Sequence, residues 1–229
     1  MQGKSNYNGH TEQEMRAIEK IRQNIEREVF DYTQLISLLN EYRKPRDVIT
    51  SLLENQEIVR IRKGLYIFGL LWRREQIPIE LLANLIYGPS FISLDYALSF
   101  YGLIPEKVKT VTSITNGRSR SFDTPIGRFS YTQISKERFS FGFEIKNSGQ
   151  GNWLITEPLK TLADKVWSDK RFRPTSVSSY NSYLYDDLRI ERTVLKEYFN
   201  IEKLNEIKTT YKSRKIDWLI EFLIKSLKE

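Results

Sequence analysis

The stretch 31–68 constrains the fold more than any other part of the chain, because it joins two short amphipathic helices to a hairpin. Pro45 stands at the start of the second helix, where its missing backbone N–H costs nothing. Alternating residues at 58–62 and 65–68, separated by a Lys-Gly turn, predict two antiparallel strands. The order helix, turn, helix and hairpin predicts an N-terminal winged helix-turn-helix.

Local signals in the same stretch support both helices. Asp31 precedes the first helix and Gln34 follows three residues later, which is the spacing of a capping box. Apolar residues recur at helical spacing in the second helix, and they predict one buried stripe formed by Val48, Ile49, Leu52 and Leu53. A further charged helix is expected within 11–28, packed behind this motif.

A winged helix places its second helix in the major groove of DNA and its hairpin tip against phosphates. The candidate DNA-binding residues are therefore Arg43, Lys44, Arg46, Asp47, Thr50, Arg60, Arg62 and Lys63. Cations on a strand edge or a helix start can also simply face water, and Asp47 and Thr50 can equally cap their helix. The segment 43–74 holds eight positive and three negative residues in a chain of net charge +7, which favours DNA contact.

Composition limits the available chemistry. The chain has 229 residues, of which 40% are hydrophobic, so it can bury a substantial core. It has no cysteine, which excludes disulfides, thiolate metal sites and cysteine nucleophiles. Its single histidine, His10, lies in a polar tail, and a Ser-His-Asp triad would need it. The tail 1–9 and the interrupted apolar run 91–104 predict neither a signal peptide nor a membrane span.

The chain divides into two expected domains, 1–75 and 76–229, with a breakpoint near Gly69–Pro78. Short apolar runs broken by turn residues predict a small antiparallel sheet of three to five strands within 108–146. The remaining patterns predict helices at 79–87, 94–100 and 156–167 and from 186 to the C-terminus. The second domain is therefore expected to be α+β, like the chain as a whole.

Two features of the second domain bear on chemistry. Asp164 and Lys165 lie on the helix expected at 156–167, with Thr156 as its cap, and such charged residues are typical of a helix surface. Asp123, Glu144 and Lys146 form the skeleton of a nuclease site, in which two carboxylates hold Mg²⁺ and the lysine orients water. Glu144 and Lys146 also share one side of a strand simply by their spacing.

Five segments carry a resemblance to a known family, and they occur in that family's order: 58–66, 92–98 followed by 101–105, 111–115, 122–127 and 156–164. They read Ile-Val-Arg-Ile-Arg-Lys-Gly-Leu-Tyr, Ile-Ser-Leu-Asp-Tyr-Ala-Leu with Tyr-Gly-Leu-Ile-Pro, Val-Thr-Ser-Ile-Thr, Phe-Asp-Thr-Pro-Ile-Gly and Thr-Glu-Pro-Leu-Lys-Thr-Leu-Ala-Asp. The chain resembles the AbiEi antitoxins, which belong to type IV toxin–antitoxin systems of the abortive-infection kind.

The resemblance implies a non-enzymatic bacterial protein of the cytoplasm that takes part in phage defence. Its winged helix would bind double-stranded DNA at its own promoter as an autorepressor. Its C-terminal domain would counter a cognate nucleotidyltransferase-type toxin, with or without a stable complex. We expect no cofactor, no metal and no membrane partner, and a monomer or weak dimer in solution. Two alternatives stay open: a Mg²⁺-dependent endonuclease using Asp123, Glu144 and Lys146, and a transcription regulator whose second domain senses a ligand or dimerises.

Overall fold

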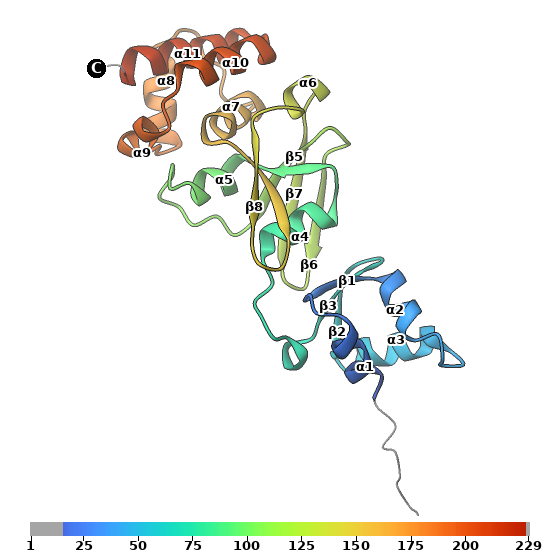
Figure 1. Cartoon of the computed structure of the whole chain (residues 1–229). Helices are drawn as coiled ribbons and strands as arrows, with labels where there is room; N and C mark the ends of the chain where they lie inside the picture. Colours follow the sequence, from blue (N-terminus) through green and yellow to red (C-terminus); the bar gives the residue numbers. More distant parts are fainter. Residues whose placement is uncertain (1–15, 228–229) are drawn as a thin grey trace, which may run out of the picture. The chain divides into compact units, whose positions relative to one another are not determined.

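The computed structural model describes residues 16–227 (Figure 1). The chain divides at the bond between Gln76 and Ile77 into two compact units, which we call the N-terminal unit and the C-terminal unit. This division lies one residue beyond the boundary expected from the sequence. His10, the tail 1–9 and the first part of the helix expected within 11–28 lie outside the described residues.

The N-terminal unit contains short helices and an antiparallel sheet with strand order β1-β3-β2. Its elements are α1 (Ala17–Asn24), β1 (Val29–Asp31), α2 (Tyr32–Leu38), α3 (Pro45–Glu54), β2 (Ile58–Arg62), β3 (Leu65–Phe68) and the 3-10 helix η1 (Leu70–Trp72). The two expected helices and the hairpin are all present. Strand β1 was not predicted from the sequence, because its three residues are too few to show a periodic pattern.

The capping box and the helix start predicted for this unit are both present. The Asp31 carboxylate accepts a hydrogen bond from the Gln34 backbone N–H, and the Gln34 side chain accepts one from the Asp31 N–H, both at 2.9 Å. Pro45 is the first residue of α3. The apolar stripe of α3 is narrower than predicted, because Ile49 and Leu52 are buried whereas Val48 and Leu53 are half-buried.

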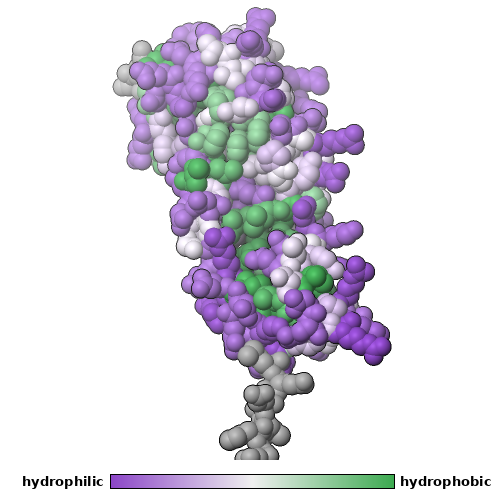
Figure 2. All heavy atoms as spheres, turned by 45° about the vertical axis from the view of Figure 1, so that its right-hand side comes forward, coloured by the Kyte–Doolittle hydropathy of each residue, from purple (hydrophilic) through white to green (hydrophobic). Residues whose placement is uncertain are grey.

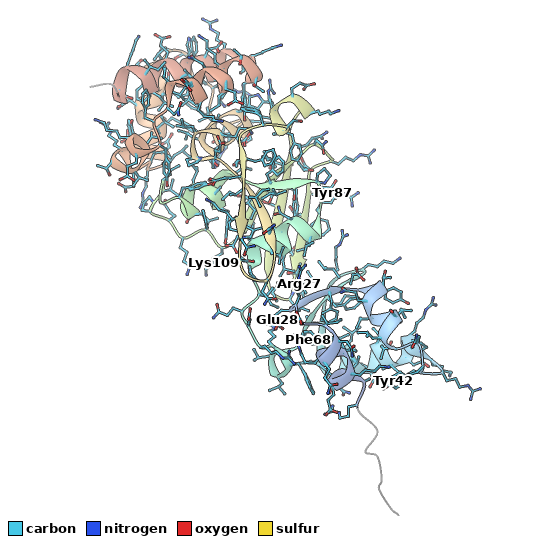
Figure 3. All side chains as sticks on the ribbon, viewed as in Figure 1. Arg27, Glu28, Tyr42, Phe68, Tyr87 and Lys109 are labelled. Atoms are coloured by element: carbon cyan, nitrogen blue, oxygen red, sulfur yellow. The ribbon has the colours of Figure 1, made fainter. Side chains whose placement is uncertain are left out.

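A buried ion pair stabilises the side of this unit formed by α1. Arg22 Nη1 donates to both carboxylate oxygens of Glu28, at 3.1 and 3.0 Å. The guanidinium also stacks 4.0 Å from the ring centroid of Phe68, and Figure 3 shows Glu28 and Phe68 close together. The backbone N–H of Arg74 donates to Glu28 at 3.1 Å. Glu28 therefore connects α1, the sheet and the segment after η1.

The C-terminal unit is built on a six-stranded sheet with strand order β6-β7-β5-β4-β9-β8. Figure 1 shows the later helices gathered at one end of this unit. In chain order the elements are α4 (Ile79–Ile86), β4 (Ser90–Ile92), α5 (Leu94–Phe100), β5 (Val111–Thr115), β6 (Arg120–Thr124), β7 (Gly127–Gln133), α6 (Lys136–Phe139), β8 (Phe143–Asn147), β9 (Asn152–Thr156), α7 (Pro158–Ser168), α8 (Ser179–Ser182), the π-helix η2 (Tyr183–Asp187), α9 (Arg192–Glu197), α10 (Ile201–Tyr211) and α11 (Arg214–Leu227).

The prediction of a small antiparallel sheet is wrong for this unit. The sheet has six strands, and β4 pairs with β9, and β5 with β7, in the parallel direction. Strand β4 was missed because all three of its residues are buried, and a fully buried strand shows no alternation. Strand β9 was not predicted either, and only its last residue, Thr156, falls in the helix expected at 156–167. The α+β class itself is confirmed.

The surface position predicted for Asp164 is also wrong, as is the capping role of Thr156. Thr156 ends β9, and α7 begins two residues later at Pro158. Helix α7 is covered on several sides, since it packs against α5, α10 and α11. Lys160 and Asp164, one turn apart, are both completely buried. Charged residues are almost never fully buried unless they are paired, and this pair was not recognisable from the sequence.

The buried polar cluster around Asp164 satisfies both charges. Lys160 Nζ donates to the two Asp164 carboxylate oxygens at 2.6 and 2.7 Å. Ser93 Oγ, at the end of β4, donates to Asp164 at 2.9 Å, and the Tyr211 hydroxyl of α10 donates to the same carboxylate. Gly142 lies beside the lysine, and a Cβ there would come within 3.1 Å of Lys160 Cγ. The cluster therefore joins the sheet to α7 and α10.

We predict that Lys160→Met destabilises the C-terminal unit by about 3–5 kcal/mol, because it leaves the Asp164 carboxylate buried without its counter-charge. The matched control is Lys165→Met on the same helix, since Lys165 pairs at 2.6 Å with Asp95, which is part-exposed, and its loss should cost clearly less than the loss of Lys160. Urea unfolding measures both. A Trp72→Phe background confines tryptophan fluorescence to Trp153, Trp167 and Trp218 of the C-terminal unit.

The double variant Lys160→Met/Asp164→Leu is the second control for this prediction. It replaces both charges with apolar side chains, and such replacements in other buried pairs are often neutral. We therefore expect it to recover most of the stability that Lys160→Met loses. Equal costs for Lys160→Met and Lys165→Met would contradict the structural role assigned to the buried pair.

Candidate nucleic-acid interface

The N-terminal turn of α3 presents three cations to solvent. Arg43 and Lys44 precede the helix and Arg46 lies in its first turn, and all three are exposed. Lys44 Nζ lies 3.7 Å from a carboxylate oxygen of Asp47, a contact between two exposed side chains that contributes little to stability. The Thr50 hydroxyl donates to the Arg46 carbonyl at 3.0 Å, so it is engaged within its own helix.

The hairpin of β2 and β3 presents three more cations, Arg60, Arg62 and Lys63. The pairing register of β2 with β3 shifts between Arg60 and Arg62. This shift interrupts the alternation of inward and outward side chains in β2 at Ile61. Ile58 and Ile61 are consequently both buried, while the two arginines remain exposed. Such a bulge re-aims side chains at the edge of a sheet. Gly64 follows in the left-handed region, with φ +85°, and closes the turn.

Tyr32, at the start of α2, adjoins both the tip of the hairpin and the start of α3. Its backbone N–H donates to the Gly64 carbonyl at the hairpin tip, at 3.1 Å. Its side chain and that of Ile36 line a hollow of about 500 Å³ together with the first turn of α3, residues 44–47. The hairpin tip and the start of α3 therefore both adjoin the first turn of α2. Sequence patterns did not indicate this role for Tyr32.

The other two cations of the basic segment lie in a different part of the unit. Arg73 Nε donates to the Phe68 carbonyl at 2.8 Å, and Arg74 Nη2 donates to the Arg22 carbonyl at 3.4 Å. Arg73 is thus held at the end of β3 and Arg74 at α1. The eight cations of segment 43–74 therefore do not lie on one surface. Six of them belong to the candidate interface.

The structure does not bring together the three residues of the nuclease hypothesis. Asp123 lies on β6 and Glu144 and Lys146 lie on β8, the two opposite edges of the sheet. Five strand spacings of about 4.8 Å separate these edges by roughly 24 Å. Asp123 instead approaches Arg128, at 3.5 Å, and Glu144 pairs with Lys146 at 2.6 Å. These three residues cannot hold one metal ion between them. The hypothesis of a nuclease site formed by Asp123, Glu144 and Lys146 is therefore wrong.

Other hydrogen bonds already occupy Glu144. The Tyr101 hydroxyl donates to its carboxylate at 2.7 Å and to the Thr156 carbonyl at 2.9 Å. Burial is the main reason that the pKa of Tyr101 lies well above its ordinary value, and Glu144 raises it further. The phenol therefore stays protonated and remains a donor at neutral pH. Glu144 thus helps to fix Tyr101 against the end of β9.

The chain matches neither a model of a known protein family nor a curated protein. Figure 2 shows hydrophilic residues over much of one face, with several hydrophobic patches between them. Within residues 16–227, no helix combines the length and the apolar character that crossing a membrane requires. A functional assignment therefore rests on the geometry of the six exposed cations around Tyr32 and on the resemblance of the sequence segments.

Proposed function

We propose that the N-terminal unit is a winged helix-turn-helix that binds double-stranded DNA and represses the protein's own promoter. One observation carries this proposal: the start of α3, with its exposed cations, and the tip of the hairpin, next to Lys63, both adjoin the first turn of α2. Among the described residues, five of these six cations have no carboxylate partner, the exception being Lys44. Unpaired exposed cations remain available for phosphate groups.

The elements suggest a specific docking arrangement. An α-helix fits the major groove, which is about 12 Å wide, so α3 would enter the groove with its N-terminal turn toward the base edges. Arg46 is the candidate for a bidentate contact with guanine, because it lies in that first turn. Arg60, Arg62 and Lys63 would contact phosphates beside the groove, positioning the helix without reading sequence.

We further propose that the C-terminal unit is the antitoxin part and counters a nucleotidyltransferase-type toxin without being an enzyme. The support here is the family resemblance, whose segments coincide with β4–α5, β5, the β6–β7 hairpin and β9–α7. These segments include Ser93, Lys160 and Asp164 of the buried cluster. The resemblance therefore concerns mainly residues that build the core, and a toxin-binding surface would lie on other residues.

The phosphate contacts predict a salt effect. We expect Arg60→Gln/Arg62→Gln/Lys63→Gln to weaken binding to every duplex and to reduce the slope of log K against log salt by about 0.9 for each lost contact. Fluorescence anisotropy with the upstream promoter duplex at several salt concentrations measures both effects. The control is Lys109→Gln/Lys196→Gln/Lys208→Gln, which removes three exposed charges from the C-terminal unit. An equal loss in the control would contradict the assigned interface.

The base contact predicts a change in specificity. We expect Arg46→Ala to relax the preference at one base pair, with a loss of about 1–3 kcal/mol of discrimination. Competition of the promoter duplex with single-base variants measures this. Lys44→Ala is the neighbouring control, and it should weaken binding to all sequences by the same factor. If Arg46→Ala leaves the ranking of the duplexes unchanged, Arg46 does not read a base.

The two roles should be separable, because each unit contains its own apolar core. We expect residues 76–229, co-expressed with the toxin of the neighbouring gene, to rescue growth without repressing the promoter. Residues 1–75 should repress a promoter reporter without rescuing growth. Rescue by 1–75 alone would show that neutralisation acts through nucleic-acid binding and that the domain roles are assigned wrongly.

A further inference from the structure

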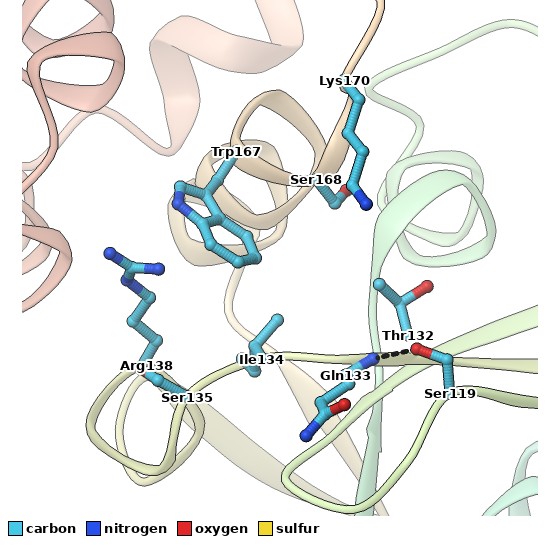
Figure 4. A pocket seen from close by; sticks show the side chains of 9 residues that line it. All are labelled: Ser119, Thr132, Gln133, Ile134, Ser135, Arg138, Trp167, Ser168 and Lys170. Carbon is cyan, nitrogen blue, oxygen red and sulfur yellow. Dashed lines mark hydrogen bonds between the residues drawn. The ribbon is translucent and has the colours of Figure 1, made fainter.

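A second cavity, which we call the Trp167 cleft, lies in the C-terminal unit (Figure 4). Its volume is about 730 Å³, which is within the usual range of small-molecule sites. The end of β7 and the loop to α6 form one side, and the C-terminal end of α7 forms the other. Its lining residues are Ser119, Thr132, Gln133, Ile134, Ser135, Arg138, Trp167, Ser168 and Lys170.

The chemistry of this lining is selective. It contains two cations, four hydroxyl groups and one amide, together with the apolar surfaces of Trp167 and Ile134, and it contains no carboxylate. The acidic residues next to it in sequence are Glu137, which is exposed, and Asp169, whose carboxylate accepts from Tyr183 and from the Arg171 N–H. The cleft therefore offers donors to an anion and a flat apolar surface to a ring.

Arg138 is held in position for this task. Its Nη2 donates to the Tyr211 carbonyl at 2.6 Å, and its guanidinium carbon lies 4.4 Å from the centroid of the Trp167 ring. The remaining N–H groups of a guanidinium anchored in this way are available to a ligand, at little further cost in side-chain entropy. Lys170 is exposed at the opposite side of the cleft and has no carboxylate partner among residues 16–227.

The cleft continues into a neighbouring hollow of about 410 Å³ over the sheet. The two cavities share Thr132, Ser168 and Lys170. The second also contains Lys165 and Arg171, but these pair with two carboxylates of the same lining, Asp95 at 2.6 Å and Asp169 at 3.5 Å. Among residues 16–227, Lys170 is the cation of this hollow without a carboxylate partner. Lys170 therefore stands where an anionic group could extend from one cavity into the other. A ligand with a planar ring at one end and phosphate groups at the other matches this arrangement, with an aromatic surface at Trp167 and a cation at Lys170.

We infer that the Trp167 cleft binds a nucleoside phosphate. The base lies against Trp167 beside the Arg138 guanidinium, the hydroxyl groups contact the ribose, and Lys170 binds the phosphates. Arg guanidinium groups and aromatic rings are the surfaces on which proteins commonly place bases. This ligand site goes beyond the proposed DNA-binding and antitoxin functions. It would let the C-terminal unit bind a small molecule.

The test is a titration of the full ¹⁵N-labelled protein with ATP, GTP, CTP and UTP, followed by the indole N–H signal of Trp167. Trp167→Phe assigns that signal among the four tryptophans. At least one nucleotide should shift it in a saturable way. The matching nucleoside and inorganic pyrophosphate should each bind about tenfold more weakly or worse, because each lacks one half of the contacts.

Variants locate the binding site. Lys170→Gln should weaken nucleotide binding by about tenfold or more, because it removes a charge-assisted contact. Lys136→Gln is the local control, since Lys136 is an exposed residue of α6 that does not line the cleft. It should change the affinity by less than about twofold. Arg60→Gln/Arg62→Gln/Lys63→Gln should also retain nucleotide binding, which separates this site from the DNA interface.

Three outcomes would overturn the inference. One is the absence of a saturable shift of the Trp167 signal with every nucleotide. Another is pyrophosphate binding as tightly as the nucleotides, which would make the cleft an anion site without a base subsite. The third is an equal loss of affinity in Lys170→Gln and in either control. None of these outcomes touches the DNA-binding proposal, which has its own readout.

Discussion

The buried carboxylate of Asp164 is the interaction on which the C-terminal unit depends most. It has no exposure to solvent, and a buried carboxylate without donors costs several kcal/mol. Its donors come from α7, from the end of β4 and from the end of α10, so all three must pack together before the charge is satisfied. Burial, reinforced by Asp164, raises the pKa of Tyr211 far above its ordinary value, and this keeps the phenol protonated as a donor. Burial lowers the pKa of Lys160, an effect that Asp164 opposes. The sheet and the C-terminal helices are thereby fixed to each other.

The N-terminal unit could be predicted in detail because its signals are local. The Asp31–Gln34 capping box, Pro45 at the start of α3 and the glycine turn at Gly64 each involve residues within a few positions of one another. The α+β class followed from the same kind of pattern. The bulge at Ile61 could not be predicted, because it depends on cross-strand pairing with β3. That pairing also determines which side chains of β2 face solvent.

The C-terminal unit was less predictable because its features depend on contacts between distant segments. The parallel pairing of β4 with β9 joins residues more than sixty positions apart, and the three buried residues of β4 show no periodicity. The burial of Asp164 depends on Tyr211, and the Trp167 cleft combines residues from 119 to 170. The candidate DNA-binding residues were named from the sequence, which already left out Arg73 and Arg74, and the structure adds the backbone carbonyls to which these two arginines donate.

The central claim is that DNA contacts the cations around Tyr32. Its most direct test is a map of backbone amide shifts in the ¹⁵N-labelled protein on titration with the promoter duplex. We expect the largest changes at residues 43–47 and 60–64, and little change in the amides around η1 and Arg74. Changes concentrated near Arg73 and Arg74, or spread over the C-terminal unit alone, would contradict it.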